Sequence, residues 1–287
     1  GQFDRGGLRR RFLLEGDGLI QAYHFSDGQV DYQSRFVRTD KFVKEERAKK
    51  TLYATWGTMA PGGLGANLMP GANWKTTAGV SVWKKYGKLY AFDEMALPYE
   101  LDPQTLETKG MHNFTPSGEQ GVYSAHPKHD PKTGQWCHFG LKTRKSLTLQ
   151  LTVLNADQTV YEQRDVPCPR YVYVHDFFLT EHYFIFILHP AFIKIPSFLL
   201  GQTSFKGCFQ WRPEEGNCVM VIPRDSQQPV KTFEAPAAWM WHSLNAYERE
   251  HEIVMDFAAF DHPDAIIGED CQLNQIMQGV CVPRKNN

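Results

Sequence analysis

The sequence predicts an all-β protein built from repeated strand units, and two observations lead to this prediction. Turn-forming residues recur between short apolar segments at places where a hairpin can reverse; they are Asp27-Gly28, Tyr86-Gly87-Lys88, Asp102-Pro103, Asp130 to Gly134 and Asn155 to Asp157. Three segments also share one order, in which a histidine is followed by a short stretch, a polar turn and an apolar strand, with steps of 49 (126 to 175) and 67 (175 to 242) residues. Four-stranded blades of a β-propeller repeat at about 40–50 residues, so this spacing favours a propeller with loop insertions.

Helical periodicity is weak along the chain. One surface helix is predicted from Thr39 to Lys50, because Asp40 stands near its start and its apolar residues lie among many charges. The Gly- and Pro-rich stretch from Gly57 to Gly79 predicts a long irregular connection, of the kind that compact folds keep for function. We do not interpret it as a domain boundary and expect residues 1–287 to form a single domain.

The composition is that of a soluble globular protein. With 287 residues, 42% hydrophobic residues and a formal net charge of -1, the chain can bury a core and lacks the positive charge of a nucleic-acid binder. The longest uncharged apolar run, Tyr183 to Ala191, is far shorter than the ~20 residues of a membrane span. The first five residues carry no apolar signal-peptide core, and the six cysteines show no Cys-x-x-Cys spacing. These features predict a cytoplasmic protein and argue against a zinc–thiolate site.

The three repeated segments begin with His126, His175 and His242. In a propeller, equivalent strand ends of successive blades face the central axis, so these side chains are expected to meet there. Neutral imidazole suits iron, copper, nickel and zinc, whereas magnesium and calcium prefer oxygen ligands, so the set predicts a transition-metal site. A ligating histidine usually donates its other ring N–H to a carboxylate. Glu94, which we place in an otherwise apolar strand from Tyr90 to Pro98, is a candidate for that carboxylate.

The other motifs of the chain give no competing function. Five further histidines fall in turns or on outer strands of the same units, where a surface or hydrogen-bonded role is the better interpretation; they are His129, His138, His182, His189 and His251. His262-Pro263-Asp264 resembles half of a two-histidine, one-carboxylate iron site, but no later histidine completes it. A Gly-x-Ser-x-Gly elbow, a Walker loop and a dinucleotide-binding Gly-x-Gly-x-x-Gly are all missing, so hydrolase and nucleotide functions have no residues to support them.

Several motifs occur together in one order. Residues Glu15 to Ile20 contain a Gly-Asp-Gly turn, Ser34 to Asp40 an Arg-aromatic-x-Arg-Thr segment, and Leu97 to Thr108 a Leu-Asp-Pro-x-Thr-Leu-Glu-Thr hairpin, and the three histidine segments follow. This set resembles the carotenoid cleavage oxygenase family, whose members include carotenoid-, apocarotenoid- and stilbene-cleaving enzymes and the vertebrate retinoid isomerase. The resemblance runs from about residue 12 to residue 260.

The resemblance implies a seven-bladed β-propeller with non-haem Fe(II) on its axis, held by four histidines and supported by glutamates. By resemblance His126, His175 and His242 are three of the iron ligands, and Glu94 is one of the supporting glutamates. The implied reaction inserts O2 across one conjugated double bond of a carotenoid or apocarotenoid. It gives two carbonyl products and needs no organic cofactor.

Two positions bear on the substrate. In stilbene-cleaving members a tyrosine and a lysine activate the substrate phenol, and the candidate tunnel residues here are Phe36 and Asp93, which disfavours a stilbene. The stretch Ile195 to Phe205 falls where relatives carry an apolar patch that dips into the membrane, which suits the extraction of a lipophilic polyene. An ordinary buried loop is the alternative. The candidate patch residues are Ile195, Phe198, Leu199 and Leu200.

Two family features have no counterpart, namely the opening strand and the fourth histidine near the C-terminus. The last histidine is His262, so we expect about five of seven blades. Three explanations are open: a fragment of a longer coding sequence, a degenerate gene product, or a compact variant with another fourth ligand. The fragment is the simplest, because the motifs show little decay. A non-catalytic propeller that binds a hydrophobic ligand or a partner is the alternative function.

Overall fold

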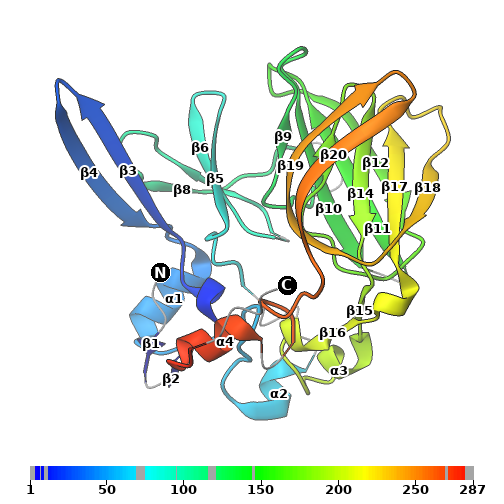
Figure 1. The fold of residues 1–287 in the computed structure, drawn as a ribbon. Helices are drawn as coiled ribbons and strands as arrows, with labels where there is room; N and C mark the ends of the chain where they lie inside the picture. Colours follow the sequence, from blue (N-terminus) through cyan, green and yellow to red (C-terminus); the bar gives the residue numbers. More distant parts are fainter. Residues whose placement is uncertain are drawn as a thin grey trace. The chain divides into compact units, whose positions relative to one another are not determined.

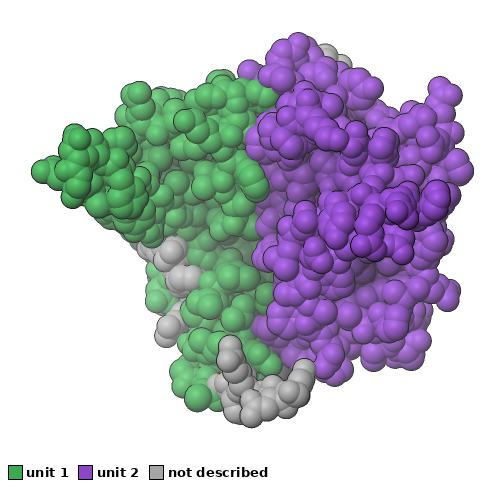
Figure 2. Space-filling model, turned by 45° about the horizontal axis from the view of Figure 1, so that its top comes forward, with its two compact units in different colours: residues 1–113, 195–208, 266–287 green, residues 114–194, 209–265 purple. Residues whose placement is uncertain are grey.

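The computed structural model describes residues 4–6, 8–9, 12–68, 75–94, 96–115, 121–143, 146–268 and 271–281. The chain forms two compact units (Figure 2). Unit 1 comprises residues 1–113, 195–208 and 266–287, and unit 2 comprises residues 114–194 and 209–265. Strands dominate both units, which confirms the all-β prediction. The single domain expected over the whole chain stays a prediction.

Unit 1 contains a four-stranded antiparallel sheet and two hairpins (Figure 1). The sheet has the order β5-β6-β7-β8, with β5 Ser81–Lys85, β6 Lys88–Phe92, β7 Tyr99–Leu101 and β8 Thr108–Met111. The hairpins are β1 Asp4–Arg5 with β2 Leu8–Arg9, and β3 Leu19–Ser26 with β4 Gln29–Phe36. The helices are α1 Asp40–Ala48, α2 Gly63–Asn67, α3 Ile195–Leu199 and α4 Gln272–Met277, and the 3-10 turns are η1 Leu13–Glu15 and η3 Lys206–Cys208.

Two of the predicted turns owe their shape to backbone conformations that glycine tolerates best. Asp27 and Gly28 join β3 to β4 with φ values of 49° and 76°, and Tyr86 and Gly87 join β5 to β6 with 51° and 76°. Two-residue hairpin turns that match the right-handed strand twist need positive φ at both central positions. The Asp-Gly and Tyr-Gly pairs therefore fix the register of both hairpins.

The helix predicted from Thr39 to Lys50 is α1. The Thr39 hydroxyl accepts a hydrogen bond from the Phe42 N–H at 3.0 Å, which caps the N-terminus. Lys49 adopts the left-handed conformation that ends the helix, with φ of 54°. Lys41 on its buried face forms ion pairs with Asp17 at 2.7 Å and with Glu45 at 3.0 Å. These charges are buried and paired, so they fix the helix to the Gly-Asp-Gly turn.

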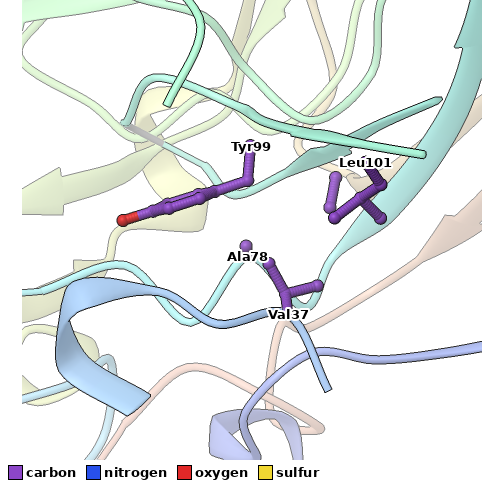
Figure 3. Packing of buried hydrophobic residues seen from close by; sticks show 5 residues of the cluster. Val37, Ala78, Tyr99 and Leu101 are labelled. Carbon is purple, nitrogen blue, oxygen red and sulfur yellow. The ribbon is translucent and has the colours of Figure 1, made fainter. Parts of the chain in front are cut away.

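The sheet of unit 1 packs against the segment that enters α1. Val37, Ala78, Ala91, Tyr99 and Leu101 form a buried hydrophobic cluster. Figure 3 shows the side chains of Val37, Ala78, Tyr99 and Leu101 facing a common interior. The cluster joins residues from β6 and β7 to two loop positions.

Two expectations for unit 1 are corrected by the structure. Strand β6 ends at Phe92, so Glu94 lies after the strand and not within it. In the residue directly after the strand, the Asp93 carboxylate accepts the N–H groups of Thr77 and Ala78 at 2.7 Å and 3.2 Å. The stretch from Gly57 to Gly79 also contains the short helix α2, and its residues 69–74 lie outside the described residues.

Unit 2 contains two antiparallel four-stranded sheets and two hairpins (Figure 1). The first sheet is β9 Lys128–His129, β10 Trp136–Thr143, β11 Leu147–Leu154 and β12 Val160–Pro167. The second is β13 Phe178–Leu179, β14 Tyr183–Leu188, β17 Asn217–Pro223 and β18 Lys231–Ala235. The hairpins are β15 Ala191–Ile193 with β16 Phe209–Trp211, and β19 Trp239–Arg249 with β20 Glu252–Phe260; a 3-10 turn, η4, spans Pro213–Glu215.

The two four-stranded sheets are meanders of the kind that form propeller blades. In the second, β14 pairs directly with β17, and the β15–β16 pair is inserted between them only along the chain. This insertion explains why the second histidine step is longer than the first. Phe178, Ile185, Ile187, Val221 and Met240 form a buried cluster that packs the second sheet against β19. Within the described residues, no helix is long and apolar enough to cross a membrane.

His189 fixes the start of β19. Its ring is buried against Trp239 at 4.8 Å between ring centroids, and Nδ1 donates to the Ala238 carbonyl at 2.7 Å. Burial lowers the pKa of His189 to about 4, although the hydrogen bonds to Ala238 and Asn217 act in the opposite direction. The neutral ring is therefore part of the folded state at neutral pH.

A histidine whose pKa is lower in the folded state makes the protein less stable as the pH falls. The unfolded chain takes up this proton near pH 6.5 and the folded chain near pH 4, so the loss develops between these values and amounts to about 3 kcal/mol. We expect His189→Gln, which keeps an N–H donor, to lose less unfolding free energy than the wild type between pH 7 and pH 4. Urea unfolding at both pH values measures this difference; equal losses would contradict it.

Candidate metal centre

The three histidines chosen from the sequence converge in unit 2. Nε2 of His175 lies 2.9 Å from Nε2 of His126 and 3.2 Å from Nε2 of His242. One ring nitrogen from each residue lies within 4.8 Å of the other two. His175 is therefore the central member of the cluster.

Two of the three histidines lie just before the first strand of a sheet. His126 lies two residues before β9, with its N–H bonded to the Ser124 hydroxyl at 3.3 Å, and His175 lies three residues before β13. His242 lies inside β19, where the pairing with β20 shifts register on both sides of Ser243. Such a bulge redirects side chains locally, so His242 is placed by an irregular strand rather than by a strand end.

Two of the three nitrogen separations suit a shared metal ion. Two nitrogens bound at 2.1 Å to one ion lie about 3.0 Å apart at a right angle and about 3.4 Å apart at a tetrahedral angle. The distance of 3.2 Å lies between these values, and that of 2.9 Å lies just below them. His126 is half-buried and His242 is exposed, so the cluster has both a protein side and an accessible side. Three imidazoles form a donor set for a transition metal.

Tyr173 supports the central histidine, and the sequence analysis did not find it. Its hydroxyl lies 2.8 Å from Nδ1 of His175. The ring is buried, stacked on Trp239 at 6.4 Å and in edge contact with Phe209 at 5.4 Å. When Nε2 of a neutral imidazole faces a metal, Nδ1 carries the proton and donates it to such an oxygen. The signal was the spacing Tyr173-Val174-His175, because alternate residues of an extended segment share one side.

Behind the imidazoles, a polar network joins the three histidine segments. The Asp176 carboxylate accepts Lys128 Nζ at 2.8 Å on Oδ1, and the Ser243 N–H and hydroxyl at 2.8 Å and 2.9 Å on Oδ2. Lys128 Nζ also donates to Ser243 Oγ at 2.8 Å. Burial acts to raise the pKa of Asp176, but the Lys128 ammonium and the N–H donors outweigh it and lower that pKa. The carboxylate is thus ionised at neutral pH.

The other candidate residues lie in unit 1. Glu94 is half-buried, and its N–H donates to Asp93 Oδ1 at 2.8 Å. Asp93 Oδ2 accepts the Thr76 hydroxyl at 2.7 Å and the Thr77 N–H at 2.7 Å, so this carboxylate organises the preceding loop. Phe36 is stacked on Phe42 of α1 with 5.1 Å between ring centroids. None of these contacts tests the roles expected for them.

The candidate patch residues occupy α3 and its C-terminal end. Leu199 and Leu200 are 47% and 51% exposed, whereas Phe198 is half-buried against Phe205. The side chain of Ile195 lies outside the described residues. A Cβ built on Gly201 would lie 2.8 Å from the backbone of Asn67, so the end of α3 packs closely on the end of α2. Leu64 and Leu68 of that region are also exposed, which gives four exposed leucines around this contact.

Comparisons with known proteins place these features in a family. The family model described as Retinal pigment epithelial membrane protein (RPE65) matches residues 1–279. Isoeugenol monooxygenase of Pseudomonas putida is 35% identical over 250 residues, which cover 85% of this chain and 50% of that protein. Apocarotenoid-15,15'-oxygenase of Synechocystis is 30% identical over 270 residues, which cover 91% of this chain and 55% of that protein.

The fold is also similar to solved structures. The cobalt-substituted Synechocystis ACO superposes with a TM-score of 0.81 and 27% identity, over 90% of this chain and 57% of that one. The chain therefore has the propeller fold of these oxygenases over the part that it shares with them. It spans about half the length of the curated relatives it matches.

Removing the Tyr173 hydroxyl tests its contact with His175. Outer-sphere partners of ligating histidines typically change metal affinity by about 10–100-fold. We expect Tyr173→Phe to weaken Co2+ binding to the full chain about tenfold, as measured by titration of the Co2+ absorption bands. Tyr161→Phe, at an exposed tyrosine of the same unit, is the control. Equal affinity of Tyr173→Phe and wild type would contradict the assignment.

Proposed function

The chain belongs to the Retinal pigment epithelial membrane protein family, and on this premise we propose that it acts as a non-haem Fe(II) oxygenase. The reaction is cleavage of a conjugated carbon–carbon double bond of a carotenoid or apocarotenoid by O2, with two carbonyl products. One observation carries the proposal: three imidazole nitrogens from separate strand units lie within 4.8 Å of one another. Packing alone does not explain such a cluster, because neutral imidazoles gain little free energy by facing each other.

The residues that would hold the iron are His126, His175 and His242, each through one ring nitrogen. The metal, when bound, supplies the activation of O2. Glu94 is proposed, on the family resemblance, as the carboxylate that supports one of these histidines. Tyr173 keeps the His175 proton on Nδ1, so that the Nε2 lone pair faces the centre. Trp241 packs its ring edge-on to His175 at 4.8 Å and keeps water from that side of the imidazole.

A lipophilic polyene is the preferred substrate. The positions that would activate a phenol carry Phe36, whose ring stacks on Phe42, and Asp93, whose carboxylate is bonded to Thr76 and Thr77. Neither offers the hydroxyl or ammonium group that a phenolate needs. This argues against a 4-hydroxystilbene. A second candidate is a small phenolic alkene, because one of the relatives is an isoeugenol monooxygenase with 35% identity.

The exposed leucines around α2 and α3 support a peripheral contact with a membrane. Four leucines of this region are 47–61% exposed; they are Leu64, Leu68, Leu199 and Leu200. An exposed apolar patch of this kind suits insertion into the acyl boundary of a bilayer. We therefore propose a cytoplasmic protein that takes its substrate from a lipid surface.

Replacement of the central histidine tests the iron site. We expect the full chain, loaded with Fe(II) without oxygen, to retain iron and to release aldehyde from a β-apocarotenal under air. His175→Ala removes the nitrogen that lies closest to both partners, and we expect its iron content and aldehyde release to fall at least tenfold. His251→Ala, at an exposed turn, is the matched control and should behave as wild type.

Three outcomes would change the assignment. Iron-free, inactive wild-type protein would favour the alternative of a non-catalytic propeller that binds a hydrophobic ligand or a partner. Unchanged iron content in His175→Ala would contradict the role of that residue. If isoeugenol or a 4-hydroxystilbene were turned over faster than the apocarotenal, the substrate would be a phenolic alkene and not a polyene.

The leucine patch is tested by membrane binding. Burial of one leucine side chain contributes about 1.5–3 kcal/mol, so loss of two should weaken binding by more than tenfold. We expect the double variant Leu199→Ser, Leu200→Ser to bind phosphatidylcholine vesicles at least tenfold more weakly than wild type in a sedimentation assay. Leu244→Ser, at an exposed leucine of unit 2, should bind as wild type does. If the double variant bound the vesicles as tightly as wild type, the leucines would not form a membrane-binding patch.

A further inference from the structure

The residues that follow the three histidines form a network of their own. Lys128 lies two positions after His126, and Asp176 and Ser243 lie directly after His175 and His242. Asp176 Oδ1 accepts Lys128 Nζ at 2.8 Å and the Phe177 N–H at 2.8 Å. Oδ2 accepts the Ser243 N–H and hydroxyl, and Lys128 closes the triangle on Ser243 Oγ. Every histidine segment is therefore tied to the other two by at least one hydrogen bond.

The network constrains position because its central charge is buried. The Asp176 carboxylate is 3% exposed, and a buried charge is tolerated only where it is paired and hydrogen-bonded. Apart from the neighbouring Phe177 N–H, its donors come from the two other segments, at places 48 and 67 residues away in the chain (176 to 128 and 176 to 243). A shift of either segment would take at least one donor away from the buried carboxylate. The three segments are thus held at one separation.

The histidine cluster needs such a constraint when no metal is bound. Two Nε2 atoms at 2.9 Å and 3.2 Å from a third bring lone pairs together, and one shared proton can relieve only one of these contacts. Adjacent residues of an extended segment point to opposite sides. Asp176 therefore sits on the side of the backbone away from the His175 imidazole, and Ser243 reaches it through its N–H and hydroxyl.

We propose that Lys128, Asp176 and Ser243 are positioning residues that set the separation of the three imidazoles before metal binding. This inference rests on the proposed metal site. It adds that the metal affinity of the site depends on hydrogen bonds between residues that do not bind the metal. The network acts within one unit and involves none of the glutamates expected from the family resemblance.

Metal titration of the full chain tests the proposal. Asp176→Asn keeps the shape of the side chain but loses the charge and one acceptor. We expect it to weaken Co2+ binding about 10–100-fold and to alter the Co2+ absorption bands, which report the ligand geometry. Ser243→Ala removes only the hydroxyl contacts and should have a smaller effect in the same direction. Ser243→Thr keeps the hydroxyl and should restore the affinity.

A matched control separates positioning from stability. Lys132 and Glu181 form an ion pair between the same two chain regions, but both side chains are exposed. Lys132→Met should leave the Co2+ affinity and absorption bands unchanged. If Asp176→Asn lowers the melting temperature but leaves both the Co2+ affinity and the bands unchanged, the residues are merely structural and the proposal is overturned.

A measurement without metal distinguishes this proposal from the proposed function. The 15N resonances of the three imidazoles in the metal-free protein report how their ring nitrogens share protons. We expect these resonances to move in Asp176→Asn and Ser243→Ala and to stay in place in Lys132→Met. If the resonances moved in these variants but the wild type did not bind Co2+, the metal site would be ruled out and the positioning role would be supported. Unmoved resonances in Asp176→Asn would overturn the positioning role itself.

Discussion

The candidate metal centre depends on one buried charge. Asp176 is ionised and almost fully buried, and its oxygens are satisfied by Lys128 and Ser243 from the two neighbouring histidine segments. Desolvation of the carboxylate makes any other arrangement of these segments unfavourable. These contacts also set the separation of the three imidazoles. Residues that bind no metal therefore fix the geometry of the residues that would bind it.

The propeller-like repeat explains why distant residues can share such a centre. Each four-stranded sheet of unit 2 is a meander, and His126 and His175 lie just before the first strands of these sheets. A site built from these entry positions tolerates insertions elsewhere, and the β15–β16 hairpin lengthens one repeat without displacing His175 from His242. His242 departs from the rule, because a bulge in β19 rather than the strand entry presents it.

Local features were predictable from the sequence because their causes are local. The positive φ values at Gly28 and Gly87, and the threonine cap of α1, follow from residues next to each other in the chain. The meeting of the three histidines followed from the repeat. The contacts of the Asp93 carboxylate with Thr77 and Ala78, just after β6 ends, could not be predicted, because they join residues 16 and 15 positions apart. The Asp176 network was missed because its pairing depends on the register and the bulge of β19.

X-ray absorption spectroscopy of the Fe(II)-loaded protein tests most directly whether the three imidazoles are ligands of one ion. We expect at least three nitrogen scatterers at about 2.1 Å, with the outer-shell scattering that imidazole rings produce. A spectrum with oxygen scatterers alone, or with fewer than three imidazoles at the iron, would contradict it.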